Sequence, residues 1–309
     1  MNRTIILLVT GMLCTSLVFS QDAQKRQTPH TLLWRISGKQ ISRPSYLFGT
    51  MHVLCAADAN LGDSLKAAIA GCDELYFEIN LGDMMGMLNS LKYMRMNDNK
   101  TLADLLKPEE YARVKDYFSK HVSMLPFGML ERFKPMLISG IIEEQGLDCE
   151  TTDGMELTIM KEAKPYNKPV NGLETAEFQA GLFDSIPYAE QARELVNYID
   201  SPEQNKAQTR QLVELYNQQD LDGIDSLSQK DDGGAESGHM DLLLYGRNRK
   251  WAKALDGLLG QKSLLIAVGA AHLPGKSGVI ALLRKEGYTV EPVVNHISKG
   301  QLAAVLSKR

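Results

Sequence analysis

The sequence predicts an α/β fold: a central mixed or mostly parallel sheet from two strand–helix–strand halves, with a large helical insertion at about 81–260. One observation is that apolar runs of strand length alternate with amphipathic stretches near both ends of the chain, which is typical of parallel pairing. The other is that Gly-x-x-His follows an apolar run twice, at 49–52 and 269–272. After a leader of about twenty residues, 21–309 is expected to form a single domain.

The first twenty residues are typical of a cleavable export signal. Arg3 provides a positive start, 5–19 is mostly apolar, and cleavage is expected between Ser20 and Gln21. An uncleaved anchor is the alternative, but the apolar run is short of the roughly 20 residues that span a bilayer. We therefore expect a periplasmic or secreted protein with no membrane span after the signal is removed.

Charge and cysteine content exclude some classes of function. The formal charge of −4 becomes −5 (33 basic minus 38 acidic residues) once Arg3 is removed with the signal. A mildly acidic domain is poorly suited to binding nucleic acid phosphates. Cys55, Cys72 and Cys149 remain, and none lies in a C-x-x-C pair, which argues against a thiolate zinc site or a redox dithiol. At most one disulfide can form, a fold of this size does not need one, and the pairing stays open.

The first half begins with the apolar run 45–48, which we expect to be a buried strand that ends in the turn carrying His52. The apolar spacing over 61–70 predicts a helix, with Gly71 as its cap. The run 74–79 is the next predicted strand, and Glu78 lies near its end.

The C-terminal half repeats this plan. It comprises a strand at 263–268, the turn carrying His272, a helix at 278–285 with Ser277 as its N-cap, and a strand at 288–294. Ligands of α/β sheets bind beyond the carboxyl ends of the strands. A single Gly-x-x-His is more often a turn with an incidental histidine, but its duplication in matching context favours one shared site.

The middle of the chain is rich in helix signals. A helix is expected from Pro108, where proline occupies the first turn and acidic residues follow it. A strand at 168–173 precedes Glu174, and the polar, glycine-rich segment 226–238 is expected to be a loop. Methionines in 84–96 and 124–160 could form a peptide-binding surface, although ordinary core packing is preferred. Further helices are expected at 124–142, broken by Pro126 and Pro135, and at 155–163, 188–198, 204–216 and 240–259.

Polar residues at the predicted strand ends form a possible metal site, made of His52, Glu78, Glu174 and His272. Imidazoles with carboxylates suit zinc, manganese, cobalt or iron and leave room for a water. The metal would acidify that water and so generate a hydroxide nucleophile. The structural alternatives are a salt bridge from Glu78 to Arg247 or Lys66, and a helix-dipole role for Glu174.

The helix at 240–259 places Arg247 and Trp251 four residues apart, on one face, where the guanidinium could reach a substrate. A solvated basic face is the alternative. His121, His239 and His296 have no strand-end context and are expected to be surface or core residues.

Five segments, in this order, resemble the TraB/GumN family, which includes the TIKI proteins: YLFGTMH, YFEIN, GLET with Gln179, LLYGRNRKWAKAL and VGAAHLPGKSGVIALLRKEGY. The resemblance covers nearly all of the chain after the signal. It implies an α/β fold in which the two Gly-x-x-His motifs form a metal site. In the TIKI branch it implies a metal-dependent protease that removes the amino terminus of a secreted signalling protein. Other branches are associated with pheromone shutdown in conjugation.

The resemblance also carries site residues over to this sequence. The metal histidines fall on His52 and His272, and no role is assigned to Glu156 in GMELTIM. The remaining positions are the acidic strand end, the mid-chain acid and amide, and the Arg-Asn pair, which fall on Glu78, Glu174, Gln179, Arg247 and Asn248.

The expected function is that of an exported metal-dependent hydrolase, a peptidase with Mn, Co or Zn as its cofactor. The two histidines bind the metal with Glu78 or Glu174, and the remaining carboxylate acts as general base. Arg247 and Asn248 polarise the scissile carbonyl or hold the substrate, and Gln179 also binds it. The alternatives are a protein that sequesters a peptide without cutting it and a metal-dependent esterase. The partner is a peptide or protein; its identity and the oligomeric state stay open.

Overall fold

The computed structural model describes residues 30–39, 41–121, 125–145, 147, 149, 151–229 and 237–296. The expected signal at 1–20 lies outside them, and so does 230–236, most of the segment predicted as a loop. The first residues of that segment instead end helix α11 (Leu221–Gln229). None of the described helices is long and apolar enough to span a membrane.

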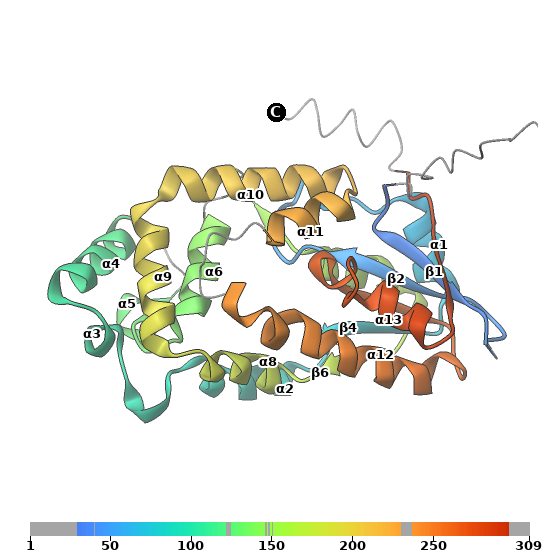
Figure 1. The fold of residues 1–309 in the computed structure, drawn as a ribbon, viewed down its shortest axis with the longest axis horizontal. Coiled ribbons are helices and arrows are strands. Elements are labelled where there is room, and N and C mark those ends of the chain that lie inside the picture. Colours follow the sequence, from blue (N-terminus) through green and yellow to red (C-terminus); the bar gives the residue numbers. More distant parts are fainter. Residues whose placement is uncertain are drawn as a thin grey trace, which may run out of the picture.

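A six-stranded sheet occupies one end of the molecule (Figure 1). The strand order is β6-β4-β7-β2-β1-β8. Strands β2, β7, β4 and β6 are parallel, whereas β1 pairs antiparallel with both β2 and β8, so the predicted mixed, mostly parallel sheet is confirmed. The strands are β1 (Leu33–Ser37), β2 (Ser45–Thr50), β4 (Glu74–Ile79), β6 (Val170–Glu174), β7 (Leu264–Gly269) and β8 (Thr289–Pro292).

The two strand–helix–strand halves interleave. Helix α1 (Asp63–Gly71) connects β2 to β4, but β7 lies between these strands. Helix α13 (Val279–Lys285) connects β7 to β8, which are separated by β2 and β1. The two strands of each half therefore run parallel, as predicted, but are not neighbours in the sheet. The apolar sequence of β7 suits this central position, because a parallel strand inside the sheet is covered on both faces.

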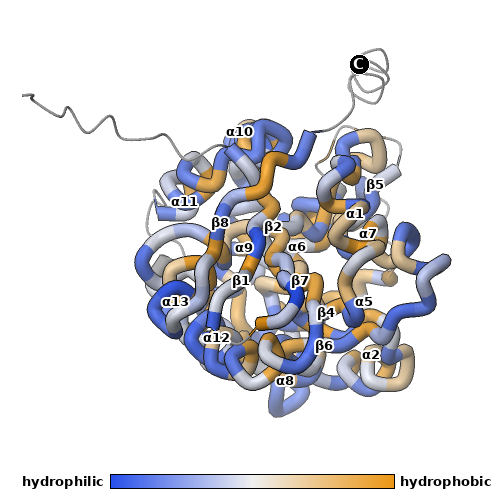
Figure 2. The backbone as a smooth tube through the Cα atoms, turned by 90° about the vertical axis from the view of Figure 1, so that its right-hand side faces the viewer, coloured by the Kyte–Doolittle hydropathy of each residue, from blue (hydrophilic) through white to orange (hydrophobic). Residues whose placement is uncertain are grey.

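Helices cover both faces of the sheet. Figure 2, seen along the long axis, shows α12 (Gly246–Leu259) and α13 on one side of the strands and α1 and α7 (Met155–Ala163) on the other. Helix α7 has the predicted bounds. The predicted N-cap of α13 is wrong, because Gly278 occupies that position and no side chain caps the helix.

The region between β4 and β7 is mostly helical, as predicted. Pro135 begins α6 rather than breaking a helix, since the first turn does not need the N–H that proline lacks. A wide π-turn at Asp241–Tyr245 leads directly into α12. The other helices are α2 (Met84–Ser90), α3 (Leu102–Leu105), α4 (Pro108–Lys120), α5 (Phe127–Leu130), α6 (Pro135–Gln145), α8 (Ala176–Leu182), α9 (Tyr188–Asp200) and α10 (Pro202–Asn217).

Two clusters of buried apolar side chains hold the fold together. One surrounds the sheet and includes Phe77 and Trp251. The other lies among α3, α4, α6 and α9 and includes Val114, Ile138 and Leu195. In Figure 1 these helices lie at the opposite end of the long axis from the sheet, and α10 runs along one side of the molecule towards α11 above the sheet.

Part of the methionine-rich region is exposed. Met84, Met85, Leu88 and Leu91 are exposed along and just after α2. Core packing, which we preferred for the methionines of 84–96, is therefore wrong for the two in this group. Helix α2 directly follows β4 and contacts α8, so this apolar group lies near the sheet edge where the parallel strands end.

Cys55 and Cys149 form a disulfide, which resolves the pairing that the sequence left open, and Cys72 is buried and free. Cys55 belongs to the short strand β3 (Leu54–Cys55), which pairs with β5 (Thr152–Asp153). The bond thus fixes the segment immediately after His52 to the segment that leads into α7.

Candidate functional site

The two Gly-x-x-His turns lie side by side at one edge of the sheet. Thr50, the last residue of β2, pairs with Gly269, the last residue of β7, and parallel strands end at the same edge. His52 and His272 follow these strand ends, and both direct Nε2 towards the same oxygen of Glu78. The distances to Glu78 Oε1 are 3.9 Å from His52 and 3.6 Å from His272. The convergence predicted from the duplicated motif is thus present.

Glu78 is a buried carboxylate near the end of β4. Its Oε1 accepts a hydrogen bond from the backbone N–H of Gly269 at 2.8 Å, and its Oε2 lies 2.5 Å from Arg247 Nη2. Burial favours protonation, but the charges of His272, Arg247 and His52 outweigh it and lower the pKa of Glu78 to about 2. Glu78 therefore remains negatively charged throughout the physiological range.

Arg247 binds two carboxylates from the first turn of α12. Its Nη2 lies 2.5 Å from Glu78 and 2.9 Å from Glu174, and its Nη1 donates to the carbonyl of Leu243 at 2.9 Å. The guanidinium also lies 4.7 Å from the ring of Trp251, which confirms the predicted shared face. The salt bridge to Glu78, considered above as the structural alternative, is present.

Asn248 fixes the tautomer of His272. Its amide donates to the carbonyls of His272 and Ser277 at 3.3 and 2.9 Å, so its Oδ1 accepts the proton of His272 Nδ1 at 2.6 Å. Burial, with help from Arg247 and His52 and against Glu78, lowers the pKa of His272 to about 3. His272 is thus a neutral imidazole whose Nε2 lone pair faces the site.

Glu156 binds Nδ1 of His52, as Asn248 binds Nδ1 of His272. This role of Glu156 was not predicted from the sequence. Glu156 Oε1 lies 2.6 Å from His52 Nδ1, although the two residues are 104 positions apart. Protein atoms around the ring desolvate it, although the side chain is 63% exposed, and so lower the pKa of His52; the hydrogen bond and charge of Glu156 outweigh this and raise that pKa to about 9. The only local signal is an acid in the first turn of α7, which is common in helices and identifies no partner.

Glu174 and Gln179 complete the buried polar network. Gln179, on α8, donates from Nε2 to Glu78 at 2.9 Å and to Glu174 at 3.3 Å. Glu174 is the last residue of β6, and the following Thr175 caps α8 by accepting from the N–H of Phe178. Glu174 therefore precedes the cap and contacts Arg247 rather than the helix terminus.

The donor atoms suit a divalent cation. A methyl group on Gly269 would lie 3.2 Å from Glu78 Oε1, 3.5 Å from His272 Cδ2 and 3.8 Å from His52 Nε2, so the three side chains surround a space that glycine leaves free. Ligand atoms about 2.1 Å from a tetrahedral metal are roughly 3.4 Å apart. The observed Nε2 to Oε1 distances of 3.6 and 3.9 Å are only slightly larger.

One contact opposes binding of a cation at His272. Arg247 Nη1 lies 3.3 Å from His272 Nε2 and takes the lone pair that a cation would use. Within the described part of the chain, no group of three or more His, Cys, Asp or Glu side chains is arranged as a metal site. A cation bound to this imidazole would require the guanidinium nitrogen to move away from it.

Access to the site is one-sided. The side chain of His52 is 63% exposed, whereas that of His272 is 5% exposed. A substrate would therefore approach from the side of His52.

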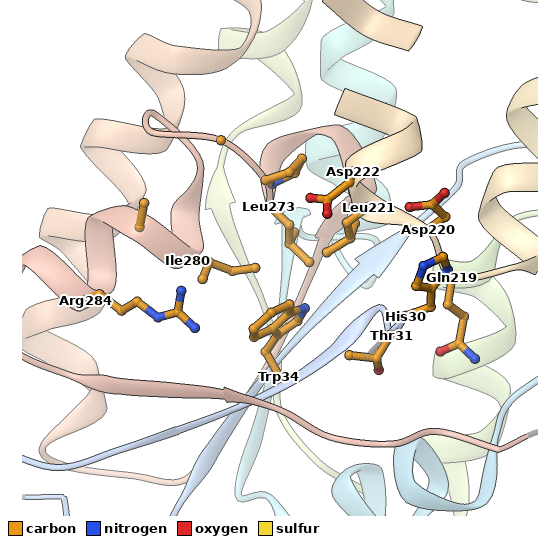
Figure 3. A pocket seen from close by; sticks show the side chains of 13 residues that line it. His30, Thr31, Trp34, Gln219, Asp220, Leu221, Asp222, Leu273, Ile280 and Arg284 are labelled. Carbon is orange, nitrogen blue, oxygen red and sulfur yellow. The ribbon is translucent and has the colours of Figure 1, made fainter. Parts of the chain in front are cut away.

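Two hollows lie near these residues. One, of about 180 Å³, lies behind the turn that carries His272; Leu273, Leu221 and Ile280 surround the ring of Trp34 there (Figure 3). Its lining includes no residue of the polar network. The other, of about 520 Å³, lies between α8 and α12 and includes Arg247 in its lining.

Known proteins resemble this chain over most of its length. The model of the TraB/PrgY/gumN family matches residues 32–292. The chain is 25% identical to a protein named Metalloprotease TIKI homolog from Amphimedon queenslandica, over 92% of this chain and 66% of that protein. It is 24% identical to Metalloprotease TIKI2 from Danio rerio (85% and 61%) and 25% identical to Metalloprotease TIKI1 from Homo sapiens (88% and 64%). The chain thus matches about two thirds or less of the length of these relatives. No solved structure matches it.

Proposed function

This chain belongs to the TraB/PrgY/gumN family, and on that premise we propose that it is an exported, metal-dependent peptidase. The observation that carries the proposal is the convergence of His52 and His272 on one oxygen of Glu78. Relatives named metalloproteases support the choice of a peptide bond as the target, since the fold by itself does not indicate chemistry.

His52, His272 and Glu78 would hold the cation, with Mn, Co or Zn as the candidates for this mixture of nitrogen and oxygen donors. When bound, such a cation supplies Lewis-acid activation of a water molecule and of the scissile carbonyl. Glu78 is suited to ligation because its low pKa keeps it charged and makes it a poor proton acceptor.

Glu174 is the remaining carboxylate, and we assign the general-base role to it. Arg247 and Gln179 hold its side chain, which is 6% exposed, in a fixed orientation. Arg247 would also stabilise negative charge that develops on the substrate oxygen, since its Nη1 already lies at the edge of the proposed metal site.

Glu156 and Asn248 are positioning residues in this proposal. Each binds Nδ1 of a histidine and so leaves Nε2 for the cation, as carboxylate and carbonyl partners of metal-binding histidines commonly do. Both the nitrogen and the oxygen of the Asn248 amide form hydrogen bonds within the protein. We therefore assign Asn248 to the positioning of His272 rather than to substrate binding.

The test is to purify residues 21–309, measure the bound metal, and assay a peptide library and simple esters with and without a chelator. We expect metal-dependent peptide cleavage that is lost in the His52→Ala, His272→Ala double variant. The exposed His121 on the distant helical end provides the control variant His121→Ala, which should stay active. Thermal unfolding of each variant reports whether it folds. Activity in a folded double variant would exclude the proposal, and cleavage of esters alone would replace peptidase by esterase.

A further inference from the structure

The larger hollow adjoins the proposed catalytic residues. It lies between α8 and α12, and Arg247 belongs both to its lining and to the buried network around Glu78. Phe178, which also lines it, precedes Gln179, the residue that bridges the two carboxylates. A peptide chain bound across the site could therefore continue into this hollow.

The floor of the hollow between α8 and α12 is apolar. Phe178 and Leu182 from α8 and Leu242 from the π-turn contribute half-buried side chains. The volume of about 520 Å³ lies within the range of roughly 300–1,000 Å³ that is typical of ligand pockets. This is enough space for a large apolar side chain and part of its neighbour.

The rim carries uncompensated positive charge. Arg249 is neutralised by Asp241, at 2.9 and 3.0 Å, and Arg247 is neutralised by the buried carboxylates. Lys250 is exposed, with its ammonium 4.8 Å from the ring centroid of Phe178. Lys253 is exposed one turn further along α12 and has no ion-pair partner within the described ranges. Two cations thus remain beside the apolar floor.

We infer that this hollow is a substrate subsite for a peptide segment in which a large apolar side chain is followed by an acidic residue. The apolar side chain packs on Phe178 and Leu182, and the carboxylate lies between the ammonium groups of Lys250 and Lys253. The inference rests on the proposed function in taking a peptide as the substrate. It adds a sequence preference that neither the fold nor the metal site determines.

Binding can be measured without catalysis. The probe is a fluorescein-labelled peptide that contains phenylalanine followed by aspartate in a glycine and serine background, titrated against the purified protein in chelator. Fluorescence anisotropy gives the affinity, and mass spectrometry verifies that the peptide stays intact. The matched peptides replace aspartate by asparagine or phenylalanine by alanine.

Lys253→Glu is the informative variant, and Lys115→Glu, on exposed α4 at the other end of the molecule, makes the same charge change away from the site. We expect the aspartate peptide to bind several-fold more tightly than the asparagine peptide in the wild type and in Lys115→Glu. In Lys253→Glu its affinity should fall roughly three- to tenfold, which removes the preference. The alanine peptide should bind weakly to all three proteins.

Equal affinity for the aspartate and asparagine peptides, a preference that persists in Lys253→Glu, or no binding would each overturn the inference. The outcome that would overturn the proposed function differs from the outcome that would overturn this inference. If the metal-loaded protein cleaves no peptide but the binding preference is present, the peptidase proposal is lost and the hollow stands as a binding site for this peptide segment. If it cleaves peptides without this preference, the subsite is lost and the peptidase proposal stands.

Discussion

The imidazole of His52 is held by the carboxylate of Glu156, with 2.6 Å between Nδ1 and Oε1. His52 is largely exposed, whereas Glu156 is buried in the first turn of α7. The pair thus ties the open side of the site to a rigid helix. It also raises the pKa of His52 to about 9, so a cation at Nε2 must displace a proton at neutral pH.

Replacing Glu156 by glutamine should change metal binding in a pH-dependent way. At pH 9, where protons compete little in either protein, the loss of orientation is expected to lower metal affinity about tenfold or more. At pH 7 the loss should disappear or reverse, because a His52 pKa of about 9 makes proton competition lower the metal affinity of the wild type roughly 100-fold, and the variant relieves most of this competition. Metal titrations at both pH values test this. Glu162→Gln on the same helix is the control, and equal losses at the two pH values would contradict the prediction.

Replacing Arg247 by alanine should destabilise the protein by about 3–5 kcal/mol at pH 7, because Glu78 and Glu174 lose the cation that neutralises them in a buried place. The loss should shrink at pH 5, because burial raises the pKa of Glu78 and the charge of Arg247 no longer opposes this effect. Urea unfolding in chelator at both pH values measures the difference. Arg249→Ala, which removes an exposed ion pair with Asp241, should cost less than about 1 kcal/mol.

The metal-free protein should be most stable near pH 6.5. The pKa of His272 falls from 6.5 to about 3 on folding, and that of Glu78 falls to about 2, so both contributions are lost as the pH falls. The pKa of His52 rises from 6.5 to about 9, so its contribution is complete below pH 6.5 and is lost as the pH rises through 9. Urea midpoints from pH 4 to 9.5 give the profile. His52→Gln should flatten only the alkaline side, and an unchanged alkaline slope would argue against the His52–Glu156 pair.

Removal of the disulfide should affect stability and the site together. The Cys55→Ala, Cys149→Ala variant frees two segments that are 94 residues apart in sequence, which typically costs about 2–5 kcal/mol. Because Cys55 lies three residues after His52, metal affinity should fall as well. Dithiothreitol should lower the melting temperature of the wild type and leave that of the variant unchanged. A wild type that is insensitive to the reductant would show that the bond is absent.

Features that depend on neighbouring residues could be predicted from the sequence. The strand at 74–79 and the helix at 155–163 have the predicted bounds, because apolar periodicity and turn residues act locally. The shared face of Arg247 and Trp251 follows from helical spacing in the same way. The convergence of His52 and His272 followed from the general rule that ligands bind beyond the ends of parallel strands.

Features that depend on contacts between residues distant in sequence could not be predicted. No local pattern states that β7 enters between β2 and β4, that Glu156 reaches His52, or that Cys55 bonds to Cys149. Many partners of similar chemistry were available to each of these residues, and tertiary packing selects among them. The exposed Met84 and Met85 illustrate the same limit, since composition does not reveal which apolar side chains stay uncovered.

The central position of β7 has a consequence for biosynthesis. During translation β2 and β4 emerge long before Leu264–Gly269, so the nascent polypeptide carries two strands whose intended neighbour has not yet been made. Unpaired strand edges promote aggregation. The edges of β2 and β4 that pair with β7 stay unpaired until this strand, which is distant in sequence, has been made and inserts between them. Truncation upstream of β7 should therefore yield an insoluble product rather than a smaller folded protein.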